Sequence, residues 1–130
     1  MSIDYFSISV GDKEILRELA MRQAEIAAQP VQAEKKELWY KHNALEITRP
    51  LIVCDPENGW KEIITDKDLQ CEGDLARTWE FAIRREIFSG SKMKDDKVIE
   101  AIFEVPLIHS DNGLGINAIF QGGGDGGLWG

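Results

Sequence analysis

The feature that most limits the fold of this 130-residue chain is a pair of apolar runs on either side of a predicted helix. Residues 51–54 form an uninterrupted apolar run, and residues 98–108 form a longer one. Such runs are typical of strands that are buried on both faces. Between them, residues 75–89 carry apolar side chains at helical spacing. This order predicts a βαβ unit, and therefore an α/β fold with a parallel sheet.

A parallel sheet of only two strands leaves both edges unpaired and both faces bare. The sequence that follows does not supply another strand: half of the twelve glycines lie in the last nine positions. No Gly-Lys-Ser/Thr motif accompanies these glycines, so we interpret them as a loop and not as a phosphate cradle. We therefore expect the chain to be the first part of a larger α/β protein.

Two helices are predicted before the first apolar run. One begins near Asp12 as its N-cap and extends to about residue 28, and the second covers residues 32–45. Pro30 either interrupts the first helix or starts the second. The second helix has a narrow apolar side, which suits a helix that covers a larger body. We assign residues 1–48 to a helical arm and residues 49–130 to the first β/α part of the main fold.

Three predictions concern the region between the apolar runs. Asp74 is placed to cap the helix that follows it, and Gly90 is placed to end that helix. Residues 60–65 are expected to be irregular or strand-like, and residues 94–97 are expected to be a solvated link. The four tryptophans are widely separated, so we expect them to pack in the core or at an interface rather than form a stacking set.

Composition excludes some classes of function. The net charge of −8 argues against non-specific nucleic-acid binding, which needs an excess of lysine and arginine. No apolar run approaches the roughly 20 residues of a membrane span. The first residues lack the pattern of a secretory signal, and Cys54 and Cys71 have no Cys-x-x-Cys spacing. We expect buried free thiols, a cytoplasmic location, and no metal site within this chain.

Polar residues near the ends of the predicted strands are the candidate site. Asp55 and Asn58 follow the first run, Glu104 lies within the second, and His109 ends it. Carboxylates and imidazoles at such positions act as general bases or hold polar substrates. The alternative for Asp55 is turn chemistry, because Asp-Pro and Asn-Gly pairs are common in tight connections. Glu104 and Glu100 are expected to face a barrel interior or to pair with an arginine such as Arg84 or Arg85.

Three stretches together resemble a known family. They are Leu16-Arg-Glu-Leu-Ala with Glu34-Lys-Lys-Glu-Leu-Trp, then Arg49-Pro-Leu-Ile-Val-Cys-Asp-Pro-Glu-Asn-Gly-Trp, and Asp96-Lys-Val-Ile-Glu-Ala-Ile-Phe-Glu-Val-Pro. They are similar to the N-terminal portion of bacterial uroporphyrinogen decarboxylase-like proteins, a superfamily that also contains corrinoid-linked methyltransferases. The resemblance covers most of the chain and rests on the amino-acid pattern of these stretches rather than on a catalytic motif.

The resemblance implies an incomplete (β/α)₈ TIM-type barrel with an N-terminal helical arm, inactive alone. Family decarboxylases bind an acidic tetrapyrrole through arginines after the first strand, whereas this chain has an acidic turn there. The methyltransferase branch is therefore favoured, with a corrinoid or thiol acceptor and a small-molecule substrate. A corrinoid protein is then an expected partner, and the zinc of that branch is bound by the later half of the barrel. Asp55, Asn58, Glu104 and His109 would contribute to the pocket wall.

Two alternatives come from other classes of function. The first is a non-enzymatic α+β interaction domain, which would form a homodimer through its helical arm and strand edges. The second is a small-ligand module with a pocket around Asp55 and His109. Uroporphyrinogen decarboxylation proper, a cofactor-free lyase reaction, is the remaining enzymatic alternative.

Overall fold

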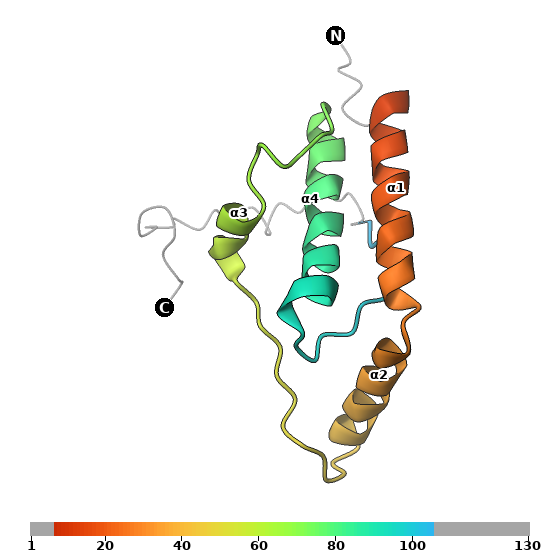
Figure 1. Ribbon diagram of the computed structural model, residues 1–130, viewed down its shortest axis with the longest axis vertical. Helices are drawn as coiled ribbons and strands as arrows, with labels where there is room; N and C mark the ends of the chain where they lie inside the picture. Colours follow the sequence, from red (N-terminus) through yellow and green to blue (C-terminus); the bar gives the residue numbers. More distant parts are fainter. Residues whose placement is uncertain (1–6, 106–130) are drawn as a thin grey trace, which may run out of the picture.

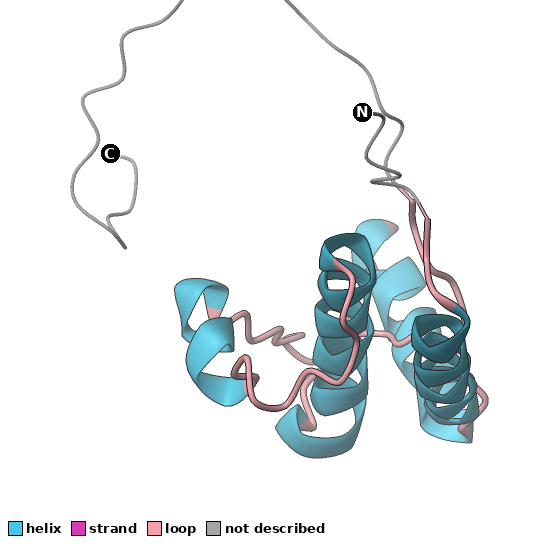
Figure 2. Ribbon diagram, turned by 90° about the horizontal axis from the view of Figure 1, so that it is seen from above, coloured by secondary structure: helices cyan, strands magenta, loops and turns pink. Residues whose placement is uncertain are grey.

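The computed structural model describes residues 7–105, and within that range the chain forms helices joined by irregular segments, without a strand (Figures 1 and 2). Helices α1 and α4 lie side by side and run in the same direction, α2 follows the lower end of α1, and α3 lies beyond α4 (Figure 1). In chain order the elements are α1 Val10–Ala27, α2 Pro30–Asn43, the 3-10 helix η1 Glu57–Gly59, α3 Trp60–Ile63, α4 Asp74–Phe88 and the π-helix η2 Ser89–Met93.

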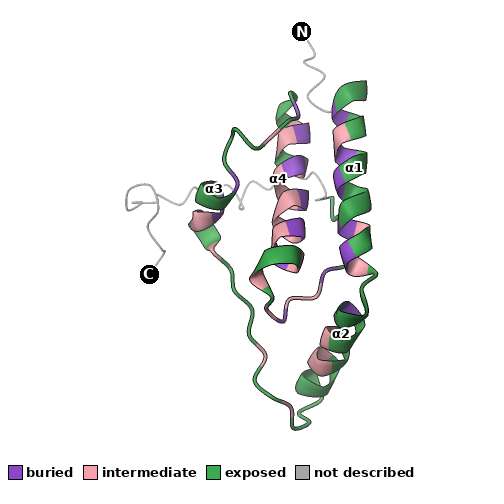
Figure 3. Ribbon diagram, in the orientation of Figure 1, coloured by how far each residue is buried: buried purple, intermediate pink, exposed green. Residues whose placement is uncertain are grey.

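The hydrophobic core lies between the facing sides of α1 and α4 (Figure 3). Its side chains recur at three- and four-residue spacing, as the sequence predicts for amphipathic helices. Burying each large aliphatic side chain contributes roughly 1.5–3 kcal/mol to folding. The partly buried Trp79 ring packs against this core, in agreement with the expectation for the tryptophans. The core residues are Leu16, Leu19, Ile26, Cys71, Ala76, Ile83, Ile87 and Ile99.

The N-cap of helix α1 lies three residues before the position predicted from the sequence. Its N-cap is Ser9, whose Oγ accepts a hydrogen bond of 3.0 Å from the N–H of Asp12. The prediction of Asp12 as the N-cap is therefore wrong. Asp12 is only 3% exposed, and its carboxylate accepts the N–H groups of Glu72 at 2.9 Å and Gly73 at 3.1 Å. It thus joins α1 to the start of α4.

A second buried carboxylate fixes the same loop. Glu80 of α4 is fully buried and accepts the N–H groups of Gln70 and Cys71 at 2.8–2.9 Å. Its charge is balanced by Arg84, one turn further along the helix, at 2.7 Å. Asp12 and Glu80 together supply partners for four consecutive backbone N–H groups, residues 70–73, which would otherwise be unsatisfied beside the core.

Gly90 does not end the third long helix, as the sequence predicts, because the helical path continues as η2 to Met93. Lys94, with a φ of 53°, then turns the chain out of the helix. Gly90 has a packing role instead. A Cβ atom at this position would lie 2.6 Å from Ile26 Cγ2 and 2.9 Å from Ile99 Cγ1. Only glycine allows η2 to approach α1 and the following segment this closely.

The two predicted strands are not strands in the described residues. Residues 51–54 and 98–105 are irregular, and the described residues contain no βαβ sheet. At their point of contact, Ile52 accepts the backbone N–H of Asp96 at 2.8 Å, and its own N–H is taken by the Asp96 carboxylate at 2.8 Å. A side chain therefore occupies the position that a neighbouring strand would fill in a ladder.

Helix α2 covers the segment after η2, and it starts with Pro30 at its first turn, which decides between the two sequence alternatives. Gln32 is its single buried residue and accepts the N–H of Ile99 at 2.8 Å. Trp39 donates its indole N–H to the carbonyl of Asp96 at 2.8 Å, and Lys36 pairs with Glu100 at 2.8 Å. These contacts confirm that α2 has a covering role.

Two smaller expectations are also corrected. Residues 60–63 are the helix α3, not a strand-like piece. Both cysteines in the described range are free, but burial holds only for Cys71, because Cys54 is exposed. Within residues 7–105, the helices are too short or too polar to cross a membrane.

Candidate functional site

Asp55, the first of the predicted site residues, is engaged in its own turn. Its Oδ1 accepts the N–H of Glu57 at 3.0 Å and the indole N–H of Trp60 at 2.9 Å. These hydrogen bonds, in that order of importance, lower the pKa of the Asp55 carboxyl, with nearby Arg85 adding to the effect. Asp55 therefore follows the alternative given by turn chemistry, and its charge also holds Trp60 in place.

The Trp60 ring is the centre of an aromatic group next to this turn. It is 4% exposed and packs edge-to-face on Phe88, with ring centroids 5.8 Å apart. The guanidinium carbon of Arg85 lies 5.2 Å from the Trp60 centroid and 6.0 Å from that of Phe81. We call Trp60 and Phe81 the aromatic platform. A planar guanidinium on such a platform keeps its charge while its faces are held by the rings.

Arg85 stands out among the basic residues of α4 because it has no ion-pair partner within residues 7–105. Arg84 pairs with Glu80 and Arg77 pairs with Asp66. The Nε of Arg85 is buried and makes no hydrogen bond to any described residue. A guanidinium with an unpaired buried N–H is uncommon in folded proteins. Arg85 is therefore the side chain in this region with unused capacity to bind an anion.

Arg85 opens onto a groove between α4 and residues 98–104, which we call the Arg85 groove. Its volume is about 320 Å³, and Glu104 is one of its lining residues. The structure thus places Glu104 in the same groove as one of the two arginines considered from the sequence. Glu100, which lines the groove as well, pairs instead with Lys36. The rest of the wall is mixed: Ile83, Ile102 and Phe103 supply its apolar part, and Gln23 and Glu86 are polar.

The other two predicted residues do not join this group. Asn58 lies on η1 and is exposed. His109 lies outside the described residues. Asp55 acts on Arg85 electrostatically, and Arg85 shares its groove with Glu104, so the arginine links the two predicted carboxylates. Within residues 7–105 no three histidine, cysteine or acidic side chains form a group that could hold a metal ion.

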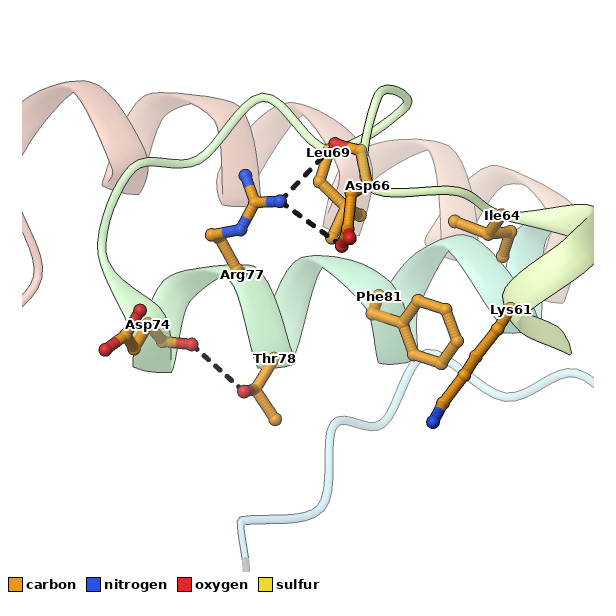
Figure 4. A pocket seen from close by; sticks show the side chains of 8 residues that line it. All are labelled: Lys61, Ile64, Asp66, Leu69, Asp74, Arg77, Thr78 and Phe81. Atoms are coloured by element: carbon orange, nitrogen blue, oxygen red, sulfur yellow. Dashed lines mark hydrogen bonds and ion pairs between the residues drawn. The ribbon is translucent and has the colours of Figure 1, made fainter. Parts of the chain in front are cut away.

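A larger groove of about 580 Å³ lies on the other side of Phe81, between α4 and the loop after α3 (Figure 4). Arg77 contacts the carboxylate and carbonyl of Asp66, and the Thr78 hydroxyl donates to the backbone carbonyl of Asp74 at 3.0 Å. Lys61 and the Asp74 carboxylate form no ion pair with a described residue. Lys61 extends along the Phe81 ring (Figure 4). The groove offers apolar surface but no unpaired buried polar group.

A two-bond ion pair lies at Asp96, in the stretch that the sequence predicts to be a solvated link. That prediction is wrong, because Asp96 is 8% exposed. Arg49 donates two hydrogen bonds to its carboxylate, at 2.6 and 2.9 Å. Those bonds, with the N–H of Ile52, hold the pKa of Asp96 well below its usual range. This group, which we call the Asp96 node, ties the two apolar runs together.

Sequence reasoning missed the importance of Arg85 and of Asp96. For Arg85 a signal was present, since Phe81 precedes it by four residues and the two share a helix face. For Asp96 the nearby sequence is simply charged, and its partner Arg49 is distant in the chain. Comparison of the chain with protein-family models, with curated proteins and with solved structures found no match in any of the three.

Proposed function

We propose that α1 and α2 belong to the N-terminal arm of a cytoplasmic barrel enzyme of the uroporphyrinogen decarboxylase-like class. The helical body, which we define as α1, α2, α4 and η2, would join the barrel through two apolar segments. We define the apolar segments as residues 46–54 and 101–105. The observation that carries the proposal is the exposure of their large aliphatic side chains. Ile47 is 103% exposed, Ile52 67%, Ile102 61% and Val105 62%.

This exposure supports a barrel junction because the first segment is held by the Asp96 node while its side chains are uncovered. The Asp96 node joins Ile52 to Asp96 through two hydrogen bonds, and Asp96 lies five residues before the second segment begins. Contiguous exposed apolar surface usually marks a place where more protein packs. Strands of a barrel with helices on its outside are covered in this way on both faces.

Within this class we propose methyl transfer, with a corrinoid or thiol acceptor, rather than tetrapyrrole decarboxylation. The support is the charge of the turn after the first apolar segment. The lowered pKa of Asp55 keeps that turn anionic, with Glu57 beside it. A negatively charged turn repels the carboxylates of an acidic tetrapyrrole. The described residues do not form a site that fits zinc, and we derive no step through a metal or corrinoid.

A dye-binding experiment tests the junction. The 130-residue chain should bind 8-anilinonaphthalene-1-sulfonate while its helices stay folded, because the apolar segments are uncovered. Replacing Ile47, Ile52 and Ile102 by serine should remove most of the dye signal. The matched control replaces Val10 and Met21, which are equally exposed but on α1. A chain that unfolds cooperatively and binds no dye would contradict the proposal.

A non-enzymatic interaction domain is the second candidate, and one observation favours it. Helices α1 and α4 share a core of their own, so this part of the chain does not need a barrel in order to fold. Sedimentation equilibrium separates the two candidates. A stable homodimer that loses its dimeric state when the apolar segments carry serine favours the interaction domain, whereas a monomer that binds dye favours the enzyme arm.

A further inference from the structure

The Arg85 guanidinium forms no ion pair with a described residue, and its Nε makes no hydrogen bond to one, although Asp55 acts on it electrostatically. It lies over the aromatic platform, 5.2 Å from Trp60 and 6.0 Å from Phe81. Asp55 fixes Trp60 through its indole N–H, so the platform itself is held in place. Little side-chain freedom is left to lose when Arg85 binds a partner, and pre-organisation of this kind favours binding.

The charges that line the Arg85 groove fall into two sets. Glu86 is neutralised by Lys97, and Glu100 is neutralised by Lys36 at 2.8 Å. Arg85 and Glu104 remain, and neither forms an ion pair with a described residue. The groove therefore presents one unpaired positive and one unpaired negative side chain.

The rest of the groove sets the size and polarity of what can bind there. Its volume of about 320 Å³ is at the lower end of the range found for small-molecule sites. Ile83, Ile102 and Phe103 supply an apolar wall. Two contacts hold this wall in place. Gln23 donates a hydrogen bond to the carbonyl of Ile102 at 3.3 Å, and Phe103 packs edge-to-face on Trp79 with ring centroids 5.4 Å apart.

We propose that the Arg85 groove binds a small zwitterion of the α-amino acid class with an apolar side chain. Arg85 binds the carboxylate, Glu104 binds the ammonium group, and the apolar wall receives the side chain. The site lies wholly within residues 7–105 and does not depend on the proposed enzyme class.

Other ligand classes fit the same groove less well. A simple anion meets Arg85 but also meets the unpaired Glu104. A simple cation is attracted to Glu104 but is repelled by Arg85. An uncharged apolar molecule would cover both charged groups without pairing either, which is costly. A zwitterion satisfies both charges and leaves the net charge of the groove unchanged.

The test is a titration of the ¹⁵N-labelled 130-residue chain, followed by NMR through the Arg85 Nε–H and Trp60 indole N–H signals. L-Leucine is the probe, and we expect saturable shifts with a Kd of about 1 mM. 4-Methylpentanoate has the carbon skeleton and carboxylate of L-leucine without the ammonium, and isopentylamine lacks the carboxylate. Each of these should bind at least about tenfold more weakly than L-leucine.

Four variants assign the two charges. Arg85→Gln and Glu104→Gln should each weaken L-leucine binding by at least about tenfold. Arg17→Gln and Glu14→Gln are the matched controls, because they make the same charge changes at exposed positions on α1 and should leave Kd unchanged. Arg85→Lys keeps the charge but loses the planar fork, so it should bind several times more weakly while retaining the fold. It decides the role of Arg85 if Arg85→Gln does not fold.

Three results would overturn the proposal. The first is that L-leucine produces no saturable shift at Arg85 and Trp60. The second is that 4-methylpentanoate binds as tightly as L-leucine, which assigns the groove to anions alone. The third is that Glu104→Gln or a folded Arg85→Lys binds L-leucine as the unmodified chain does.

Discussion

The helical body and the apolar segments both contain aliphatic side chains but differ in what covers them. In α1 and α4, each helix satisfies its own backbone, and the facing sides bury the apolar residues. In residues 46–54 and 101–105, the apolar side chains are exposed and the backbone has few partners among the described residues. The comparison shows that two packed helices satisfy their own backbone hydrogen bonds and bury their own apolar side chains. A strand-like run needs neighbouring chain segments for both.

The largest expected difference between these regions is in the reactivity of their cysteine thiols. Burial, with the Glu80 carboxylate beside it, raises the pKa of the Cys71 thiol from 9.0 to about 12. Three pKa units leave about a thousandfold less thiolate, the reactive form. Cys54 lies on an apolar segment and is exposed. We expect Ellman's reagent to modify Cys54 readily and Cys71 only after denaturation, with Cys54→Ser removing the rapid phase.

Glu80 tests whether the helical body relies on its buried charge. Glu80→Ala removes the partner of Arg84 and leaves the N–H groups of Gln70 and Cys71 unsatisfied. Losing one member of a buried pair typically costs about 3–5 kcal/mol. Urea unfolding followed by circular dichroism measures the loss. Glu14→Ala on the exposed side of α1 should change the free energy of unfolding by less than about 0.5 kcal/mol.

An isoleucine truncated in each region sharpens the comparison. Ile99 is 1% exposed, and Ile99→Ala should lower the free energy of unfolding by roughly 2–4 kcal/mol. Ile52 is 67% exposed, so Ile52→Ala should cost less than about 0.5 kcal/mol in the 130-residue chain. Equal costs at the two positions would show that the apolar segments are covered after all.

Gly90 tests the close approach of η2 to α1. In an ordinary helix, glycine to alanine is stabilising, since alanine has the higher helix propensity. Here the new Cβ would clash with Ile26 and Ile99 at 2.6 and 2.9 Å. We expect Gly90→Ala to destabilise by about 1–3 kcal/mol, as overpacking does. A more stable variant in thermal unfolding would mean that the contact is looser than the structure has it.

Acid should weaken the helical body through its two buried carboxylates. Hydrogen bonds from Glu72 and Gly73 lower the pKa of Asp12 below its ordinary value of 3.8. For Glu80, burial raises the pKa, but hydrogen bonds from Cys71, Gln70 and Arg84 lower it overall from 4.5.

Both groups have a lower pKa in the folded state than in the unfolded state. Their contribution is therefore complete above about pH 5 and is lost as the pH falls through 4.5 and 3.8 towards the folded values. Urea unfolding between pH 7 and pH 3 should show this decline, and the Asp12→Asn variant should show a smaller one. If the free energy of unfolding stays constant as the pH is lowered from 4.5 to 3, the buried carboxylates of Asp12 and Glu80 do not stabilise the fold in this way.

The sequence was sufficient for the parts of the molecule whose signals are local. The 3.6-residue spacing located α1, α2 and α4, and the apolar faces of α1 and α4 became the core. Prediction from the sequence failed where the residue that binds a side chain is distant in the chain. Asp12 looked like a cap because Glu72 and Gly73 cannot be anticipated, and Asp96 looked solvated because Arg49 is 47 residues away.

The candidate site shows the same division. Asp55 in a turn was a local interpretation, and the structure places it there. Arg85 was named only as one of two arginines, because its importance comes from Trp60, which packs beneath it from another element. The resemblance to a barrel family stays a prediction, since residues 7–105 contain the helices but no strand.

Residue-level hydrogen exchange on the 130-residue chain tests the central claim most directly. The account predicts that core amides of α1 and α4 exchange only through global unfolding, while most amides of residues 46–51 and 101–105 exchange at nearly free rates. Ile52, whose N–H is held by Asp96, should be intermediate. Protection of residues 46–51 and 101–105 equal to that of α1 and α4 would contradict the claim that these segments await a covering partner.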